Sequence, residues 1–167
     1  MLTRRNLLQG SAGIAAIALG AGPGLARAPF QTFQAPGFYR THLGRYEVTA
    51  ISDGTIPMDF AAVYLNTTPE EVKTAMEAAF RETPTPTSVN AFVINRGDRL
   101  VMVDAGTGTY LGKQLGHLTM NLEASGYRAE QIDDILLTHI HTDHSGGLTV
   151  DGKRVFPNAT VHVNQRE

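Results

Sequence analysis

The sequence predicts an α+β domain, and three observations lead to this prediction. Two Val/Ile-rich runs, residues 89–95 and 99–104, are separated by Arg-Gly-Asp, which is turn chemistry between two strands. Residues 69–81 have the start signals and the apolar spacing of a helix. A dense group of histidine and aspartate side chains, residues 139–144, follows directly after a short apolar run. The 167 residues are enough for one ordinary domain.

Residues 1–28 are expected to be an export signal and not part of the fold. Arg4 and Arg5 precede an uncharged stretch rich in Gly, Ala, Ile and Leu, which ends in a small-x-small cleavage pattern at residues 26–28. The paired arginines resemble a twin-arginine signal, and the apolar run is too short for a membrane span. The mature protein is therefore expected to be periplasmic or secreted by the twin-arginine route, without a stable membrane anchor.

The composition limits the classes of partner and of metal site. The leader contains three of the 14 basic residues and none of the 16 acidic residues, so the mature chain is more acidic than the formal net charge of −2. Such a chain has no basic stripe for nucleic acid and no cationic amphipathic helix for a membrane surface. Because the chain has no cysteine, any metal site must use histidine and carboxylate ligands.

The segment after the leader begins without a clear pattern. Residues 29–44 mix Pro, Gly, Gln and aromatic residues, and are expected to form a linker or an arm on the surface of the domain. Residues 45–52 alternate well enough for a first strand, which Asp53 and Gly54 close with a turn. The domain itself is expected to occupy residues 45–167.

The helix predicted at residues 69–81 has the strongest local signals. Thr68, Pro69 and Glu71 supply an N-cap, a proline at the first helical position and the acid of a capping box. Residues 82–88 contain two prolines and cannot continue this helix, so they are expected to be an extended connector that leads into the hairpin.

A Gly-rich loop, residues 105–108, follows the hairpin and leads into a second predicted helix that stops near Gly126. Residues 134–138 then form a short apolar strand, and residues 157–163 are expected to form one more. The second helix is predicted from four leucines that share one face: Leu111, Leu115, Leu118 and Leu122.

Four potential metal ligands lie within six residues: His139, His141, Asp143 and His144. In an extended loop, residues two apart point the same way, so His139 and His141 can hold one ion while Asp143 and His144 reach a second. Packing does not explain this density, because three neighbouring imidazoles without a metal leave several ring nitrogens to satisfy. Imidazole and carboxylate ligands suit zinc, or manganese, iron and cobalt, better than calcium or copper(I).

Residues 138–147 resemble the H-x-H-x-D-H signature of the metallo-β-lactamase superfamily, and residues 101–106 resemble its upstream strand ending in Asp-x-Gly. Further segments make the chain similar to the branch that contains methyl parathion hydrolase and lactonase-like enzymes. These segments are residues 48–54, 87–90 and 156–159.

The resemblance implies the αβ/βα sandwich of that superfamily, of which this chain holds only the first half. It assigns His139 and His141 to one metal ion and Asp143 and His144 to the other, with Asp143 also handling the proton of the attacking water. Asp104 would lie behind the ligands and steady the metal loop, or cap the turn of residues 105–108, and these two roles are compatible.

The implied activity is hydrolysis of an ester-type bond, in a lactone or a phosphotriester, by a metal-bound hydroxide at two divalent ions. Two alternatives are a mono-iron thiol or persulfide oxygenase of the same fold, and an inactive truncated fragment that binds metal weakly. The intact hydrolase would contain two ions and the oxygenase one.

The ligand count indicates a fragment. Two four-coordinate ions need more ligands than the four in this segment, and the family's remaining ligands lie downstream. The other histidines, His42, His117 and His162, are expected to be surface residues. The chain alone is therefore expected to be inactive, although a homodimer could pair two halves. Tyr110, Leu111 and the arm of residues 29–44 are candidates to line the pocket of a small-molecule substrate.

Overall fold

The computed structural model describes residues 28–30 and 35–167, and the sheet and helices lie in the compact unit formed by residues 35–167. All but the last residue of the predicted export signal lie outside the described residues. In the described part of the chain, no helix is long and apolar enough to cross a membrane.

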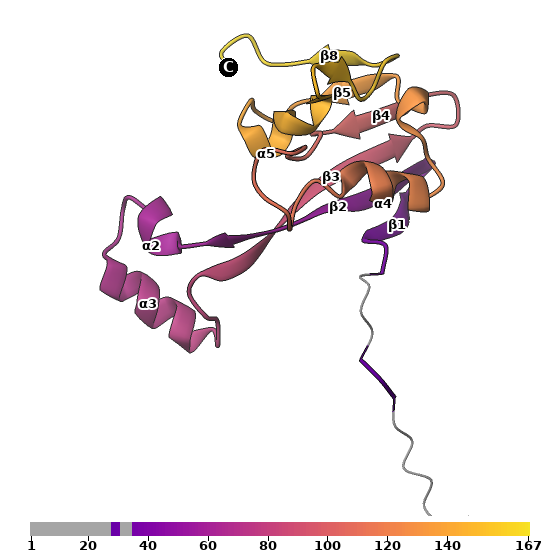
Figure 1. Cartoon of the computed structure of the whole chain (residues 1–167). Coiled ribbons are helices and arrows are strands. Elements are labelled where there is room, and N and C mark those ends of the chain that lie inside the picture. Colours follow the sequence, from indigo (N-terminus) through magenta and orange to yellow (C-terminus); the bar gives the residue numbers. More distant parts are fainter. Residues whose placement is uncertain (1–27, 31–34) are drawn as a thin grey trace, which may run out of the picture. The chain divides into compact units, whose positions relative to one another are not determined.

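A six-stranded mixed sheet organises the unit, in the order β1-β2-β3-β4-β5-β8 (Figure 1). The first four strands pair antiparallel, whereas β5 pairs parallel with both β4 and β8. The strands are β1 (Phe38–Leu43), β2 (Tyr46–Met58), β3 (Thr85–Asn95), β4 (Leu100–Val103), β5 (Asp134–Leu136) and β8 (Thr160–His162). A separate two-stranded sheet pairs β6 (Thr149–Val150) with β7 (Lys153–Arg154).

The predicted hairpin is confirmed, but the strands before it are longer than expected. β1 lies within the segment predicted to be a linker or arm. Its backbone pairs with β2, although all six of its side chains are exposed. The turn predicted at Asp53 and Gly54 is wrong. The chain forms a bulge there, between Ser52 and Gly54, and β2 continues to Met58. The predicted connector also joins the sheet, because β3 begins at Thr85.

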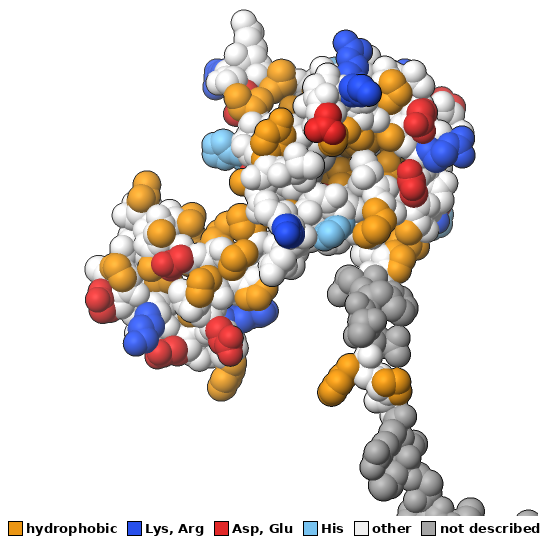
Figure 2. Space-filling model, viewed as in Figure 1, with side chains coloured by type: hydrophobic (Ala, Val, Ile, Leu, Met, Phe, Trp, Pro, Cys, Tyr) orange, Lys and Arg blue, Asp and Glu red, His pale blue; other side chains and the backbone are white. Residues whose placement is uncertain are grey.

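Beyond the bulge, β2 and β3 extend away from the rest of the sheet and carry helices α2 (Phe60–Val63) and α3 (Pro69–Ala78) (Figure 1). The capping box of α3 forms as predicted, with Thr68 and Glu71 bonded reciprocally. The helix ends three residues earlier than predicted, since Phe80 adopts a left-handed conformation with φ 54°. Figure 2 shows apolar side chains over this lobe, where Leu65 is 91% exposed and Phe80 97% exposed.

The second predicted helix is wrong over its first half. Only α4 (Leu118–Ala124) forms, while residues 105–117 make a loop in which Gly112 and Gly116 have φ values of 104° and 81°. Positive φ is incompatible with a right-handed helix, and this backbone preference overrides the leucine spacing.

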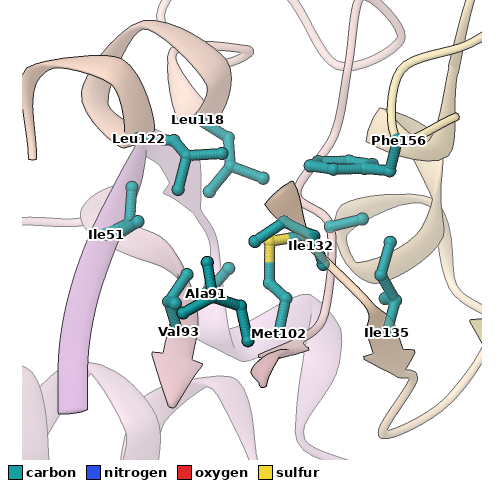
Figure 3. Packing of buried hydrophobic residues seen from close by; sticks show 11 residues of the cluster. Ile51, Ala91, Val93, Met102, Leu118, Leu122, Ile132, Ile135 and Phe156 are labelled. Carbon is teal, nitrogen blue, oxygen red and sulfur yellow. The ribbon is translucent and has the colours of Figure 1, made fainter. Parts of the chain in front are cut away.

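One face of the sheet packs against α4 and the segment that contains Phe156 (Figure 3). Ala91, Val93 and Met102 point to this face and are fully buried. The alternate residues of these strands and of β5 point to the opposite face, where Phe92 and Leu136 are each 42% exposed. The core therefore lies on one side of the sheet. It comprises Ile51, Ala91, Val93, Leu100, Met102, Ala105, Leu118, Leu122, Ile132, Ile135 and Phe156.

Candidate metal centre

The predicted metal ligands lie just beyond the carboxyl end of β5, on a loop and the one-turn helix α5 (Thr142–Ser145). The expected extended loop is only partly observed, because Asp143 and His144 belong to α5. The imidazole rings nevertheless converge. The ring centre of His139 lies 4.7 Å from that of His141 and 4.0 Å from that of His144.

Asp143 and His144 face each other at one end of this group. Asp143 Oδ2 lies 3.0 Å from His144 Nε2. The other ring nitrogen of His144, Nδ1, lies 2.8 Å from Oδ2 of Asp104. His144 is therefore held between two carboxylates, one on its own helix and one at the end of β4.

Asp104 holds the start of the metal loop as well as His144. Its Oδ1 accepts hydrogen bonds from the backbone N–H of Thr138, at 2.8 Å, and from the Thr138 hydroxyl, at 3.0 Å. The Thr138 hydroxyl also lies 3.1 Å from Nδ1 of His139. Asp104 thus contacts the metal loop, as the resemblance implies. Thr138 is a polar neighbour that the sequence analysis did not single out, although it directly precedes the histidine signature.

The donor chemistry of this cluster fits a transition-metal ion, but the arrangement is incomplete. Three imidazoles and a carboxylate are ligands that zinc and similar ions prefer. Within residues 28–30 and 35–167, however, no group of three or more His, Cys, Asp or Glu side chains is arranged so that it could hold an ion. A closed coordination sphere would therefore need donors beyond those that the described residues bring together.

The Gly-rich loop after β4 packs directly on the metal loop. Ala105 N–H donates to the backbone oxygen of His144 at 2.7 Å, and Gly147 N–H donates to the oxygen of Gly106 at 3.0 Å. A Cβ atom on Gly147 would lie 1.9 Å from the oxygen of Ala105, so no larger residue fits there without moving the backbone. This close approach explains the glycine at position 147, which ends the signature.

Of the other three histidines, which were expected to be surface residues, His42 and His162 are exposed and His117 is half-buried. His162 is exposed on the edge strand β8, with Nε2 2.9 Å from Oδ1 of Asp134. Arg99 and His162 both hold the pKa of Asp134 below its ordinary value, with the Arg99 hydrogen bond as the larger cause. His42 is exposed on β1, and His117 is half-buried just before α4. His162 therefore has a carboxylate partner in the sheet.

Of the candidate pocket residues, Tyr110 lies next to the metal loop. It lines a cavity of about 240 Å³ together with Thr142, Ser145, Gly146 and Thr149, and its side chain is 63% exposed. Leu111 is exposed in the same loop. Tyr110 thus borders a space beside α5, while residues 38–43 of the predicted arm belong to the edge of the sheet.

The family match covers the part of the chain that builds this site. Residues 84–162 match the metallo-β-lactamase superfamily. The solved structure of AbOPH, a hydrolase in the β-lactamase superfamily, superposes with a TM-score of 0.74 and 38% identity over 80% of this chain. The chain carries a metallo-β-lactamase superfamily domain. Its predicted fold class, the first half of the αβ/βα sandwich, is thereby confirmed.

A second solved structure lies in the same branch. AidC, a dizinc quorum-quenching lactonase, superposes with a TM-score of 0.71 and 29% identity over 77% of this chain. A probable metal-dependent hydrolase from Staphylococcus aureus shares the fold at 22% identity, with a TM-score of 0.63, over 76% of this chain and 50% of its own. No curated protein sequence matches the chain significantly.

The metallo-β-lactamase domain described here is about half as long as these structures. The chain covers 46% of AbOPH and 45% of AidC. The similarity to these two proteins agrees with the predicted hydrolase and lactonase-like branch, and the superfamily implies divalent metal ions.

Proposed function

We propose that this chain forms the amino-terminal half of a two-metal hydrolase that cleaves an ester-type bond, in a lactone or a phosphotriester. The proposal rests on one observation, the environment of His144. If Nδ1 donates its proton to Asp104, Nε2 carries a lone pair that faces the carboxylate oxygen of Asp143 at 3.0 Å. Two lone pairs at this distance repel each other unless a proton or a cation lies between them.

The four ligands divide into two pairs in this proposal. His139 and His141 would hold one ion, and Asp143 and His144 the other. Asp104 would select the tautomer of His144 by accepting the Nδ1 proton, which leaves Nε2 free to bind. Two divalent ions at such a site supply Lewis-acid activation of a water molecule and of the bond that it attacks.

Asp143 has a second proposed role, in proton transfer. Its side chain is 40% exposed, so solvent and substrate can reach a carboxylate oxygen. Asp143 can accept a proton from the attacking water and pass it on, although a carboxylate that also binds metal is a weaker base than a free one. The substrate class is supported by the similarity of this chain to AidC, a lactonase, and to AbOPH, a hydrolase.

The metal content of a protein that contains this chain and the complete domain tests the proposal. Elemental analysis should find about two transition-metal ions per protein molecule, and about half of that after replacement of His139 and His141 by alanine. The matched control is replacement of His42 and His162 by alanine, which should leave the metal content unchanged. Equal metal content in the His139/His141 variant and the unmodified protein would contradict the ligand assignment.

We also propose that the protein is exported by the twin-arginine route. Arg4 and Arg5 are the residues that support this proposal, and they lie outside the described part of the chain. Replacing both with lysine preserves the charge but removes the paired arginines, so we expect the precursor to accumulate in the cytoplasm. Cell fractionation measures this, and normal export of the lysine variant would refute the route.

A further inference from the structure

A fully buried carboxylate, that of Asp53, lies beneath the loop that carries Asp104. Asp53 is 0% exposed and stands on β2 at the bulge between Ser52 and Gly54. Among the described residues, no lysine or arginine forms an ion pair with it. A buried carboxylate without a cationic partner is costly unless hydrogen bonds satisfy its oxygens.

Three donors satisfy the Asp53 carboxylate, two in the loop after β4 and one at the start of α4. Oδ2 accepts from the backbone N–H of Thr107, at 2.9 Å, and from the Thr107 hydroxyl, at 2.7 Å. Oδ1 accepts from the N–H of Leu118, the first residue of α4, at 2.9 Å. Asp53 therefore fastens both this loop and the start of α4 to the central sheet.

The loop approaches the carboxylate so closely that only glycine fits at its apex. Gly106 has φ +70°, and a Cβ atom there would lie 2.8 Å from Cγ of Asp53. The opposite side of the loop contacts the metal loop through the Gly106–Gly147 and Ala105–His144 backbone hydrogen bonds. The loop is thus held on one side by Asp53 and holds the metal loop on the other.

We infer that Asp53 is a positioning residue for the metal ligands, acting through Thr107 and the loop of residues 104–108 on His144. The metal-binding part of this inference rests on the proposed function, whereas its structural part does not. Asp53 contacts none of the four proposed ligands, so its effect on them is indirect. An amide at this position would turn an NH₂ group toward hydrogen-bond donors, so Asp53→Asn should loosen the loop.

Amide hydrogen exchange on the 167-residue chain tests the structural part. In Asp53→Asn, the amides of Ala105 and Gly147 should exchange at least about tenfold faster, while the amides of β3 keep their rates. Thr107→Val removes one of the three donors, so exchange of the same two amides should accelerate less than in Asp53→Asn. Thr107→Ser keeps the hydroxyl, so these amides should exchange at the same rates as in the unmodified chain.

Unchanged exchange at Ala105 and Gly147 would overturn the inference, and so would equal acceleration of every amide, which indicates general destabilisation. If Asp53→Asn fails to fold, the comparison of Thr107→Val with Thr107→Ser decides the question in the same way. A local effect confined to Ala105, Gly147 and their neighbours supports the inference.

Cobalt binding tests the consequence for the metal site. A Co²⁺ titration followed by ligand-field absorption should show about tenfold weaker binding for Asp53→Asn, as is typical when support behind metal ligands is removed. Equal Co²⁺ affinity in the variant and the unmodified chain would contradict an effect on the ligands. If the unmodified chain and the complete domain both take up no Co²⁺, the proposed function fails, while the exchange measurement still decides whether Asp53 positions the loop.

Discussion

At the scale of single residues, Asp104 combines an unusual backbone conformation with several contacts. Its φ is 60°, in the left-handed region that only glycine, asparagine and aspartate visit readily. The conformation turns the chain sharply after β4, so that the carboxylate reaches Thr138 and His144. The Asp104 carboxylate therefore contacts the metal loop, while its backbone conformation makes the turn that leads into residues 105–108.

Replacing Asp104 tests how much these contacts contribute to stability. Asp104→Ala removes every acceptor of the side chain and places alanine at a positive φ, so the free energy of unfolding should fall by roughly 2–3 kcal/mol. Asp104→Asn keeps one side-chain oxygen, and asparagine tolerates this φ. The free energy of unfolding should therefore fall by only roughly 1 kcal/mol. Urea unfolding measures both values. Equal stability of the alanine variant and the unmodified chain would show that the contacts contribute nothing.

At the scale of elements, α3 is stabilised mainly by its own sequence. Of its ten residues only Val72 is buried, so tertiary packing holds it weakly. Its capping box supplies the local stabilisation. The backbone N–H of Thr68 and the hydroxyl of Thr67 both donate to the Glu71 carboxylate, at 2.8 and 2.9 Å.

The stability of α3 should depend on pH through Glu71. The Thr68 backbone hydrogen bond, followed by those from the Thr67 and Thr68 hydroxyls, lowers the pKa of Glu71 below its ordinary value. The folded pKa is the lower one, so the stabilisation is present above the ordinary glutamate pKa and disappears as the pH falls through the lowered value.

Amide exchange or NMR chemical shifts across residues 68–78 should show the first turn of α3 fraying in this acid range. Glu71→Gln keeps an acceptor for the Thr68 N–H but cannot titrate, so its α3 should not respond over the same range. An identical acid response in the glutamine variant would exclude Glu71 as the cause.

At the scale of the whole molecule, the sheet has one packed face and one open face. α4 and Phe156 cover the face of Met102 and Ile135, whereas Phe92 and Leu136 on the other face remain 42% exposed. The chain also spans less than half the length of AbOPH and AidC. Among the described residues, nothing covers this open face as α4 and Phe156 cover the other.

We expect the 167-residue chain alone to show little or no catalysis, because two ligands per ion neither hold the ions tightly nor fix the geometry that activates water. The purified chain, loaded with zinc or manganese, should hydrolyse an aryl phosphotriester and a simple lactone no faster than a variant with Asp143→Ala and His144→Ala. Turnover clearly above that variant would show that the second half is dispensable.

Features that depend on residues close together in the chain could be predicted from the sequence. The α3 capping box, the hairpin of β3 and β4, the helix stop at Gly126 and the group of ligands in residues 139–144 all follow from local pattern. Local patterns predict well here because the interacting residues lie within eleven positions of one another.

The end of β2, the shortened α4 and the contacts of Asp53 depend on long-range contacts in the folded chain. Asp53 and Gly54 have the sequence of a turn, yet the strand continues because its backbone pairs with β3 and because Thr107 and Leu118, 54 and 65 residues away, donate to the carboxylate. The leucine spacing of residues 111–122 likewise yields to a loop in which Gly112 and Gly116 have positive φ. Contacts between residues so far apart in the chain leave no periodic signal in the sequence. The two partners of each contact meet only when the sheet brings their segments together.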